Sequence, residues 1–172
     1  MHPEYSKLQP YLETLRVKPN KSVDLKDDFK TDYDDKILSK EEGEALLQTG
    51  IDLLSEMQDK LYASGKHSVL IILQAMDAAG KDSAIKNIMT GLNPQGVKVT
   101  SFKVPSSNEL AHDYLWRHYI ALPAAGEIAI FNRSHYENVL VTRVHPEYIL
   151  NEHIPNVTSV KDIDQQFWDT RF

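Results

Sequence analysis

The residues from Ala75 to Ser83 have the composition of a loop that binds phosphate. Gly80 and Lys81 stand where the pattern G-x-x-x-x-G-K-[ST] places its second glycine and its lysine. Glycine lets the backbone approach an anion closely, and lysine supplies a mobile positive charge. Two positions depart from the pattern, because Ala75 replaces the first glycine and Asp82 the hydroxyl residue, with Ser83 one position late. The segment therefore predicts a phosphate-binding loop of altered sequence, and an ordinary strand-to-helix turn is the alternative.

This loop stands between a predicted strand and a predicted helix. Residues 69–73 form an apolar run rich in β-branched side chains, which predicts a strand buried on both faces. After the loop, apolar residues recur at helical spacing, at Ile85, Ile88, Met89 and Leu92. The N-terminus of a helix presents backbone N–H groups and a favourable dipole to an anion. The candidate phosphate-binding residues of this region are therefore Ala78, Ala79, Gly80, Lys81, Asp82, Ser83 and Lys86.

Asp77 is an unusual residue for such a loop. An acidic side chain would repel a bound phosphate unless a divalent cation stood between the two. Magnesium binds proteins through one or two carboxylates and completes its coordination with substrate phosphates and water. Asp77 is therefore a candidate Mg²⁺ ligand, and a turn or cap role is the alternative.

A second polar cluster follows the apolar run from Ile128 to Phe131, which predicts another short buried strand. Asn132 and Arg133 come directly after it. Ligands of open α/β sheets bind outside the carboxyl ends of the strands, so we expect this cluster and the loop to share one edge. Arg133 suits bidentate phosphate contact and the stabilisation of charge in a transition state. A surface salt bridge is the alternative for Arg133.

Glu137 lies on a helix that is expected to begin near Ser134. Its carboxylate is a candidate metal ligand together with that of Asp77. A capping box with Ser134, three positions earlier, is the alternative role for Glu137. His135 is expected to pack or to form a hydrogen bond rather than to bind a metal.

The composition sets limits on these candidates. The chain has 172 residues, of which 41% are hydrophobic and 26% are charged, and its formal net charge is −6. An acidic chain binds a polyanion only where its cations are segregated from its acids. Lys103, Arg117 and Arg143 are therefore added to the candidate phosphate-binding residues, because they flank the motifs. A solvated helix position suits Arg117 equally well.

Three classes of partner or site are not expected. No basic stripe with interleaved aromatic residues is present, so nucleic acid is not expected as a partner. No apolar run reaches the length of a membrane span, so a membrane partner is not expected. The sequence has no cysteine, which excludes disulfides and thiolate metal sites. The lack of cysteine fits a reducing compartment, and we predict a cytoplasmic protein.

The chain is expected to have two parts. Residues 1–38 are polar and turn-rich and are predicted to form an extended N-terminal arm, and residues 39–172 are predicted to form an α/β domain. Ser39 and Glu42 have the spacing of a capping box at the start of a helix. The expected buried stripe of that helix is Leu46, Leu47, Ile51, Leu54, Met57 and Leu61.

Further strands and helices are expected after the loop. Residues 97–102 alternate like a strand. A helix is predicted from Ser106 or Ser107 to Ile120, and Glu109 is placed to form a capping box with Ser106. A last helix is predicted over residues 159–172.

Five segments, in order and at sensible spacing, resemble the polyphosphate kinase 2 family. They are Met76-Asp-Ala-Ala-Gly-Lys-Asp82, Phe102-Lys-Val-Pro-Ser-Ser107, Tyr114-Leu-Trp-Arg-His118, Leu122-Pro-Ala-Ala-Gly-Glu127 and Phe131-Asn-Arg-Ser-His-Tyr-Glu137. The resemblance implies a Mg²⁺-dependent transfer of phosphate between inorganic polyphosphate and an adenine nucleotide. It also implies a P-loop kinase-like, three-layer α/β/α fold with a mainly parallel sheet.

The same resemblance assigns roles to individual positions. Asp77, Lys81, Asn132, Arg133 and Glu137 match the functional positions of the two motifs. Many members have aspartate where this chain has Asn132, and the pair Asn132 and Glu137 resembles the branch that acts on both AMP and ADP. Family members commonly assemble as dimers or tetramers, so a homo-oligomer is expected.

One departure from the family pattern concerns length. Family members continue past the position of Phe172, so the C-terminal strands and the lid are expected to be missing from this chain. The leading hypothesis is a polyphosphate:AMP/ADP phosphotransferase with Asp77, Lys81, Asn132 and Arg133 as catalytic residues. An ATP-dependent nucleotide or nucleoside kinase and a non-catalytic phosphate-binding module are the alternatives.

Overall fold

The computed structural model describes residues 5–28 and 39–171. The chain divides into two compact units, Met1–Met57 and Gln58–Phe172, so the division falls inside a helix. In the part of the chain that the structure describes, no helix combines the length and the apolar character that crossing a bilayer requires.

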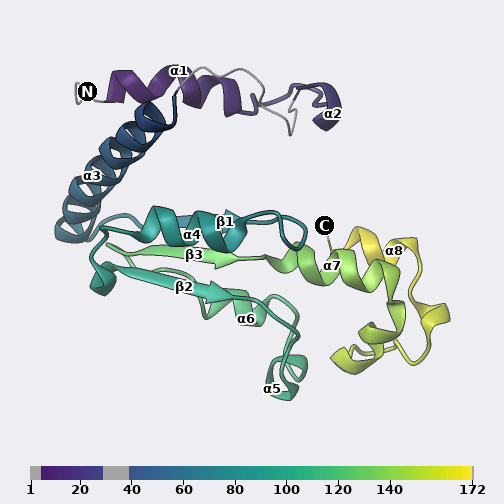
Figure 1. Cartoon of the computed structure of the whole chain (residues 1–172). Coiled ribbons are helices and arrows are strands. Elements are labelled where there is room, and N and C mark those ends of the chain that lie inside the picture. Colours follow the sequence, from purple (N-terminus) through teal and green to yellow (C-terminus); the bar gives the residue numbers. More distant parts are fainter. Residues whose placement is uncertain (1–4, 29–38, 172) are drawn as a thin grey trace. The chain divides into compact units, whose positions relative to one another are not determined.

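The first unit is helical (Figure 1). It contains α1 (Tyr5–Leu15), α2 (Leu25–Asp28) and most of α3 (Lys40–Ser64). The expectation of an extended arm is therefore wrong for the described residues before position 39, although residues 1–4 and 29–38 lie outside the description. Pro10 lies inside α1, and the missing N–H of proline is why the sequence disfavours a helix there.

The start of α3 confirms the predicted capping box. The Glu42 N–H donates to Ser39 Oγ at 3.1 Å, and the Ser39 N–H donates to the Glu42 carboxylate at 2.7 Å. The predicted buried stripe of this helix is wrong, because Leu47 and Met57 are exposed and the other four residues are only half-buried. Gln58 is instead the buried residue of α3. Its amide exchanges two hydrogen bonds with the backbone of Asn93, at 2.8 and 2.9 Å.

The second unit is built on a parallel sheet of three strands in the order β1-β3-β2 (Figure 1). The strands are β1 (Val69–Leu73), β2 (Val97–Ser101) and β3 (Ile128–Asn132). Val69 and Val97 are both in register with Ile128. The predicted α/β class with a parallel sheet is therefore confirmed.

The central strand β3 is the buried one. Ala129 and Ile130, which face opposite sides of the sheet, are both fully buried. One face of β3 packs against Phe102 and Ala121 through Ala129 and Phe131. The expectation that β1 is buried on both faces is wrong, because β1 has one neighbouring strand among the described residues and Ile72 is 49% exposed.

The loops between the strands carry short helices. The element α4 (Lys81–Met89) follows β1, and the 3₁₀ turn η1 (Pro94–Gly96) precedes β2. Between β2 and β3 lie α5 (Ser107–Leu110) and α6 (Trp116–Tyr119). The capping box of Ser106 and Glu109 is confirmed. The single helix expected to run to Ile120 is wrong, because the Asp113 carboxylate accepts from the Leu115 N–H at 2.9 Å and forms a turn there.

The C-terminal part forms a second small core. It consists of α7 (His135–Val144), η2 (Pro146–Glu152), η3 (Val160–Asp162) and α8 (Gln165–Asp169). Val139, Ile149 and Trp168 form its buried centre. The continuous helix expected over residues 159–172 is wrong, because Asp164 caps a separate α8 by accepting from the Phe167 N–H at 2.9 Å.

Candidate functional site

The carboxyl ends of β1 and β3 bring the two polar clusters together, as the sequence predicted. Leu73 and Asn132 are register partners at the ends of the parallel strands. One residue further, the Arg133 N–H donates to the Leu73 carbonyl at 2.9 Å. The residues that follow β1 and the residues that follow β3 therefore diverge from a common point on the sheet edge.

A cavity of about 990 Å³ opens at this edge. All the predicted site residues line it except Ala79, Lys86 and Arg143. Arg143 instead lies 5.3 Å from the centroid of the Trp168 ring, in the C-terminal core. The volume is within the range of small-molecule sites, and the cations Lys81, Lys103, Arg117 and Arg133 are among its lining residues.

The loop between β1 and α4 contains two residues in the left-handed backbone region. Ala78 and Gly80 both have positive φ angles, of 62° and 86°. An L-residue in this region costs roughly 1–2 kcal/mol, and glycine avoids that cost at position 80. The Lys81 ammonium donates to the carbonyls of Ala75 and Met76, both at 2.8 Å. In this structure the lysine is therefore folded back onto its own loop.

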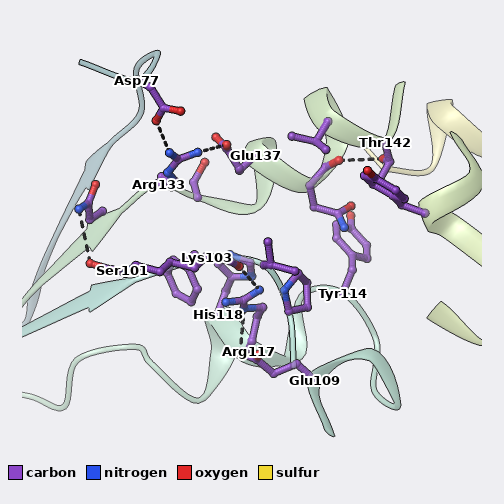
Figure 2. A pocket seen from close by; sticks show the side chains of 18 of the residues that line it. Asp77, Ser101, Lys103, Glu109, Tyr114, Arg117, His118, Arg133, Glu137 and Thr142 are labelled. Atoms are coloured by element: carbon purple, nitrogen blue, oxygen red, sulfur yellow. Dashed lines mark hydrogen bonds and ion pairs between the residues drawn. The ribbon is translucent and has the colours of Figure 1, made fainter. Parts of the chain in front are cut away.

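Arg133 is the cation that pairs with two carboxylates at the site. It has a φ of 73°, a strained backbone conformation of the kind that clusters at functional sites. Its guanidinium binds Asp77 through one nitrogen and Glu137 through another, as Figure 2 shows. The two carboxylates predicted as metal ligands therefore converge on one cation, although they come from the loop after β1 and from α7.

The alternative role of Glu137 in a capping box is not observed. Ser134 is the N-cap of α7, and its hydroxyl accepts from the Tyr136 N–H at 3.2 Å. The Ser134 N–H donates to the side chain of Gln74 rather than to Glu137. The Glu137 carboxylate is thus directed to Arg133 and to the Gln74 amide, which donates to it at 2.8 Å.

Gln74 is a site residue that the sequence reasoning missed. Its side-chain carbonyl accepts from both the N–H and the hydroxyl of Ser134, each at 2.9 Å, while its NH₂ holds Glu137. It thereby joins the end of β1 to the start of α7. A polar residue directly after the apolar run of β1 was the available signal.

Asn132 presents an oxygen that no described group satisfies. Its NH₂ donates to the Asp82 carboxylate at 2.7 Å, and its side-chain carbonyl oxygen is buried without a hydrogen-bond partner among the described residues. Buried polar atoms normally have a partner. This oxygen and the carboxylates of Asp77 and Glu137 are each oxygen donors of the hard type that Mg²⁺ prefers. The residues therefore fit the predicted cation.

The acidic groups of the site are not clustered in the way that a protein-only metal cage requires. Residues 5–28 and 39–171 contain no group of three or more histidine, aspartate or glutamate side chains placed to bind a metal. A metal bound by two carboxylates keeps several positions for phosphate oxygens and water, which is the usual arrangement for Mg²⁺ at phosphoryl-transfer sites.

Arg117 lies at the middle of the cavity wall and is already paired. Its Nε is 3.0 Å from the Glu109 carboxylate, and Nη1 donates to the Lys103 carbonyl at 2.9 Å (Figure 2). Burial acts to raise the pKa of Glu109, but the hydrogen bonds from Ser106 and the charge of Arg117 outweigh it and lower the pKa. Arg117 therefore anchors the segment after β2, and a phosphate contact stays a prediction.

His118 adds a pH-dependent feature to this wall. Its ring lies 4.1 Å from the Phe102 ring, centroid to centroid. Burial and the nearby charge of Arg117 lower the pKa of His118 to about 4. In the unfolded chain the His118 imidazole binds a proton once the pH falls below the ordinary histidine pKa. In the folded protein it stays neutral until the pH approaches about 4. The His118 contribution to stability is therefore complete above the ordinary value and is lost as the pH falls towards the folded value.

We expect His118→Phe to weaken the acid sensitivity of folding. The phenyl ring keeps the contact with Phe102 and cannot titrate. The wild type should lose about 1–2 kcal/mol more of unfolding free energy than the variant between about pH 7.5 and pH 5, after allowance for partial exposure. Denaturant unfolding at both pH values measures the difference. His135, whose pKa burial also lowers, keeps part of the dependence. Equal losses in the two proteins would contradict the assignment.

Comparisons with known proteins identify related sequences. The family model described as Polyphosphate kinase 2 matches residues 37–170. The chain is 47% identical over 158 residues to an ADP-polyphosphate phosphotransferase of Rhodopseudomonas palustris, covering 92% of this chain and 53% of the relative. It is also 47% identical over 136 residues to an AMP/ADP-polyphosphate phosphotransferase of Meiothermus ruber, covering 77% of this chain and 50% of the relative.

A solved structure gives the same result for the fold. The crystal structure of polyphosphate kinase 2 from Arthrobacter aurescens TC1 superposes with a TM-score of 0.71 at 35% identity, covering 92% of this chain and 52% of that one. This chain thus spans about half the length of the relatives that it matches. The match over residues 37–170 includes both strand ends that build the cavity. The chain belongs to the polyphosphate kinase 2 family.

Proposed function

We propose that this chain carries a site for Mg²⁺-dependent phosphoryl transfer between inorganic polyphosphate and AMP or ADP. The observation that carries the proposal is that Lys81, Arg133 and two carboxylates line one cavity, with both carboxylates paired to Arg133. Relatives that are 47% identical are named for phosphotransfer between polyphosphate and ADP or AMP/ADP, which supports this choice of substrates.

The proposed phosphoryl transfer depends on positioning and charge neutralisation more than on acid–base catalysis. A terminal phosphate of AMP or ADP is already an oxyanion nucleophile, so a general base is not required. Transfer is then accelerated by holding donor and acceptor in line and by neutralising the charge on the transferring group. Lys81 and the amides of residues 78–83 hold phosphate oxygens in this proposal. Arg133 stabilises the charge that develops during transfer.

Asp77 and Glu137 are the residues that would hold Mg²⁺, and Asn132 orients a phosphate or a bound water. When bound, the cation neutralises phosphate charge and fixes the geometry of the phosphate chain. In this structure Arg133 neutralises both carboxylates and Lys81 binds its own loop. Both cations must therefore exchange partners when a phosphate chain enters.

The remaining cations of the prediction fall into two groups. Lys103 and Arg117 line the cavity, which supports the proposal that they contact phosphate. Lys86 and Arg143 do not line it, and their predicted phosphate contacts have no support from the described side chains. A cytoplasmic location and assembly into a homo-oligomer stay predictions.

The test is a comparison of phosphate donors. The chain is assayed for ATP formation from ADP, and for ADP formation from AMP, with polyphosphate and Mg²⁺. Lys81→Ala should lower the rate on the order of 10²–10³-fold, because it removes the mobile charge of the loop. The control Lys161→Ala, at an exposed position of η3, should leave the rate unchanged.

Three other outcomes would contradict the proposal in different ways. Turnover with ATP as donor and none with polyphosphate would indicate an ATP-dependent kinase. Binding of polyphosphate without turnover would favour a non-catalytic binding module, an alternative that matters because the chain spans about half of its relatives. Unfolding of Lys81→Ala at the assay temperature would remove the purely catalytic role of that lysine.

A further inference from the structure

The end of the cavity remote from the loop differs in chemistry from the phosphate end. Asn138, Val141 and Thr142 of α7 line it together with Tyr148, Asn151 and Glu152 of η2. None of these six is a lysine or an arginine. Figure 2 shows Tyr114 and Thr142 well away from Asp77 and Arg133. A polyanion finds no counter-charge among these six residues.

Two residues of this wall, and Tyr114, which also lines the cavity, contact one buried arginine that does not itself line it. Arg171 is 6% exposed. Its guanidinium forms an ion pair with Glu152, and both side chains are 6% exposed. Nη1 also donates to the Asn138 side-chain oxygen at 2.9 Å. The guanidinium carbon lies 4.3 Å from the centroid of the Tyr114 ring.

The side chains of Arg171, Asn138 and Glu152 form a closed ring of hydrogen bonds. Asn138 accepts from Arg171 through its oxygen and donates to Glu152 through its nitrogen at 2.8 Å. Both ends of the amide are therefore assigned, and its orientation is fixed. The Tyr114 hydroxyl donates to the Arg171 carbonyl at 3.4 Å, so the ring is held at its edge as well as at its face. Residues from α7, η2 and the α5–α6 connection are thereby locked to one another.

We propose that Arg171 is a positioning residue for the nucleoside part of the nucleotide substrate. This inference rests on the proposed function and adds the location of one substrate part. A nucleoside offers an uncharged heteroaromatic ring with hydrogen-bond donors and acceptors. The wall that Arg171 holds offers an aromatic ring and, at Asn138, an amide of fixed orientation. The phosphates of the same nucleotide then extend towards Lys81 and Arg133.

The proposed role of Arg171 in positioning the nucleoside can be separated from a general contribution to folding, because AMP and polyphosphate bind the same cavity in this proposal. A loosened fold weakens the binding of AMP and of polyphosphate together. A misplaced nucleoside wall weakens the binding of AMP and leaves polyphosphate binding intact. The ratio of the two affinities is therefore the diagnostic quantity.

The experiment is a titration of the chain with AMP and, separately, with polyphosphate by isothermal calorimetry. The variant is Arg171→Lys, which keeps a positive charge beside Glu152 but lacks the planar fork that also reaches Asn138. The Kd for AMP should rise about tenfold or more, and the Kd for polyphosphate should stay within about twofold. The control Lys161→Met removes an exposed cation from neighbouring η3 and should change neither affinity.

The outcomes separate this inference from the proposed function. Equal affinity of Arg171→Lys and wild type for AMP, or equal weakening of both substrates, would overturn the inference and leave the function standing. Arg171→Lys could lose AMP binding selectively while the wild type shows no turnover with polyphosphate. That combination would support the inference but exclude polyphosphate as the donor. No AMP binding by the wild type would overturn both. A variant that a thermal melt shows to be unfolded is titrated at the lower temperature at which it is folded.

Discussion

Arg133→Ala is expected to lower the rate of phosphate transfer on the order of 10³-fold, because an arginine that neutralises a transferring phosphate contributes an effect of this size. The guanidinium is partly exposed and lies between Asp77 and Glu137, where a phosphate chain would enter. Its loss removes the cation and leaves the two carboxylates facing each other. The rate with polyphosphate and ADP, at saturating concentrations of both, measures the effect.

Two further variants define what the arginine contributes. Arg133→Lys keeps one charge and loses the fork that reaches both carboxylates, so its rate should fall between those of the wild type and the alanine variant. Arg16→Ala removes an exposed arginine from the surface pair with Glu13 and should leave the rate unchanged. A fall in melting temperature that accounts for the lost activity of Arg133→Ala would contradict a role in transfer.

Glu152→Ala is expected to give the largest loss of stability. The change leaves the guanidinium of Arg171 buried without its carboxylate. Removal of one partner from a buried ion pair costs about 3–5 kcal/mol of unfolding free energy, which corresponds to about 10–20 °C in melting temperature. Thermal unfolding followed by circular dichroism measures the shift.

The contribution of burial is tested by a matched pair at the surface. Glu13→Ala breaks the pair with Arg16, whose side chains are 46% and 57% exposed, and should cost less than about 1 kcal/mol. The double change Glu152→Met with Arg171→Met removes both buried charges and should recover much of the loss. If the Glu152→Ala protein were as stable as the Glu13→Ala protein, the buried pair would contribute little to the stability of the fold.

The sequence predicted those features that depend on neighbouring residues. The capping boxes of Ser39 with Glu42 and of Ser106 with Glu109 span three positions, and both are present. The sharing of one sheet edge by the loop and by Asn132 also followed, because strand direction fixes where the carboxyl end lies.

The errors have a common physical cause, which is that burial and proximity depend on contacts distant in the sequence. The apolar run of β1 looked doubly buried, but its exposure depends on which strands flank it in the sheet. Gln74 joins Ser134 and Glu137 about 60 positions away, and Arg171 joins Asn138 and Glu152. Arg143 lies close to the second motif in sequence, yet it stacks on Trp168.

The position of β1 in the sheet has a consequence for handling the protein. Among the described residues, β1 pairs with β3 on one side, and its side chains Val69, Leu70 and Ile72 are exposed. Proteins usually blunt such an edge with charge, proline or a covering element, since a free strand edge is a template for β-pairing between molecules. The edge of β1 has none of these features in its own five residues. We therefore expect any self-association of this chain at high concentration to begin at this edge, on a strand whose carboxyl end leads into the loop before α4.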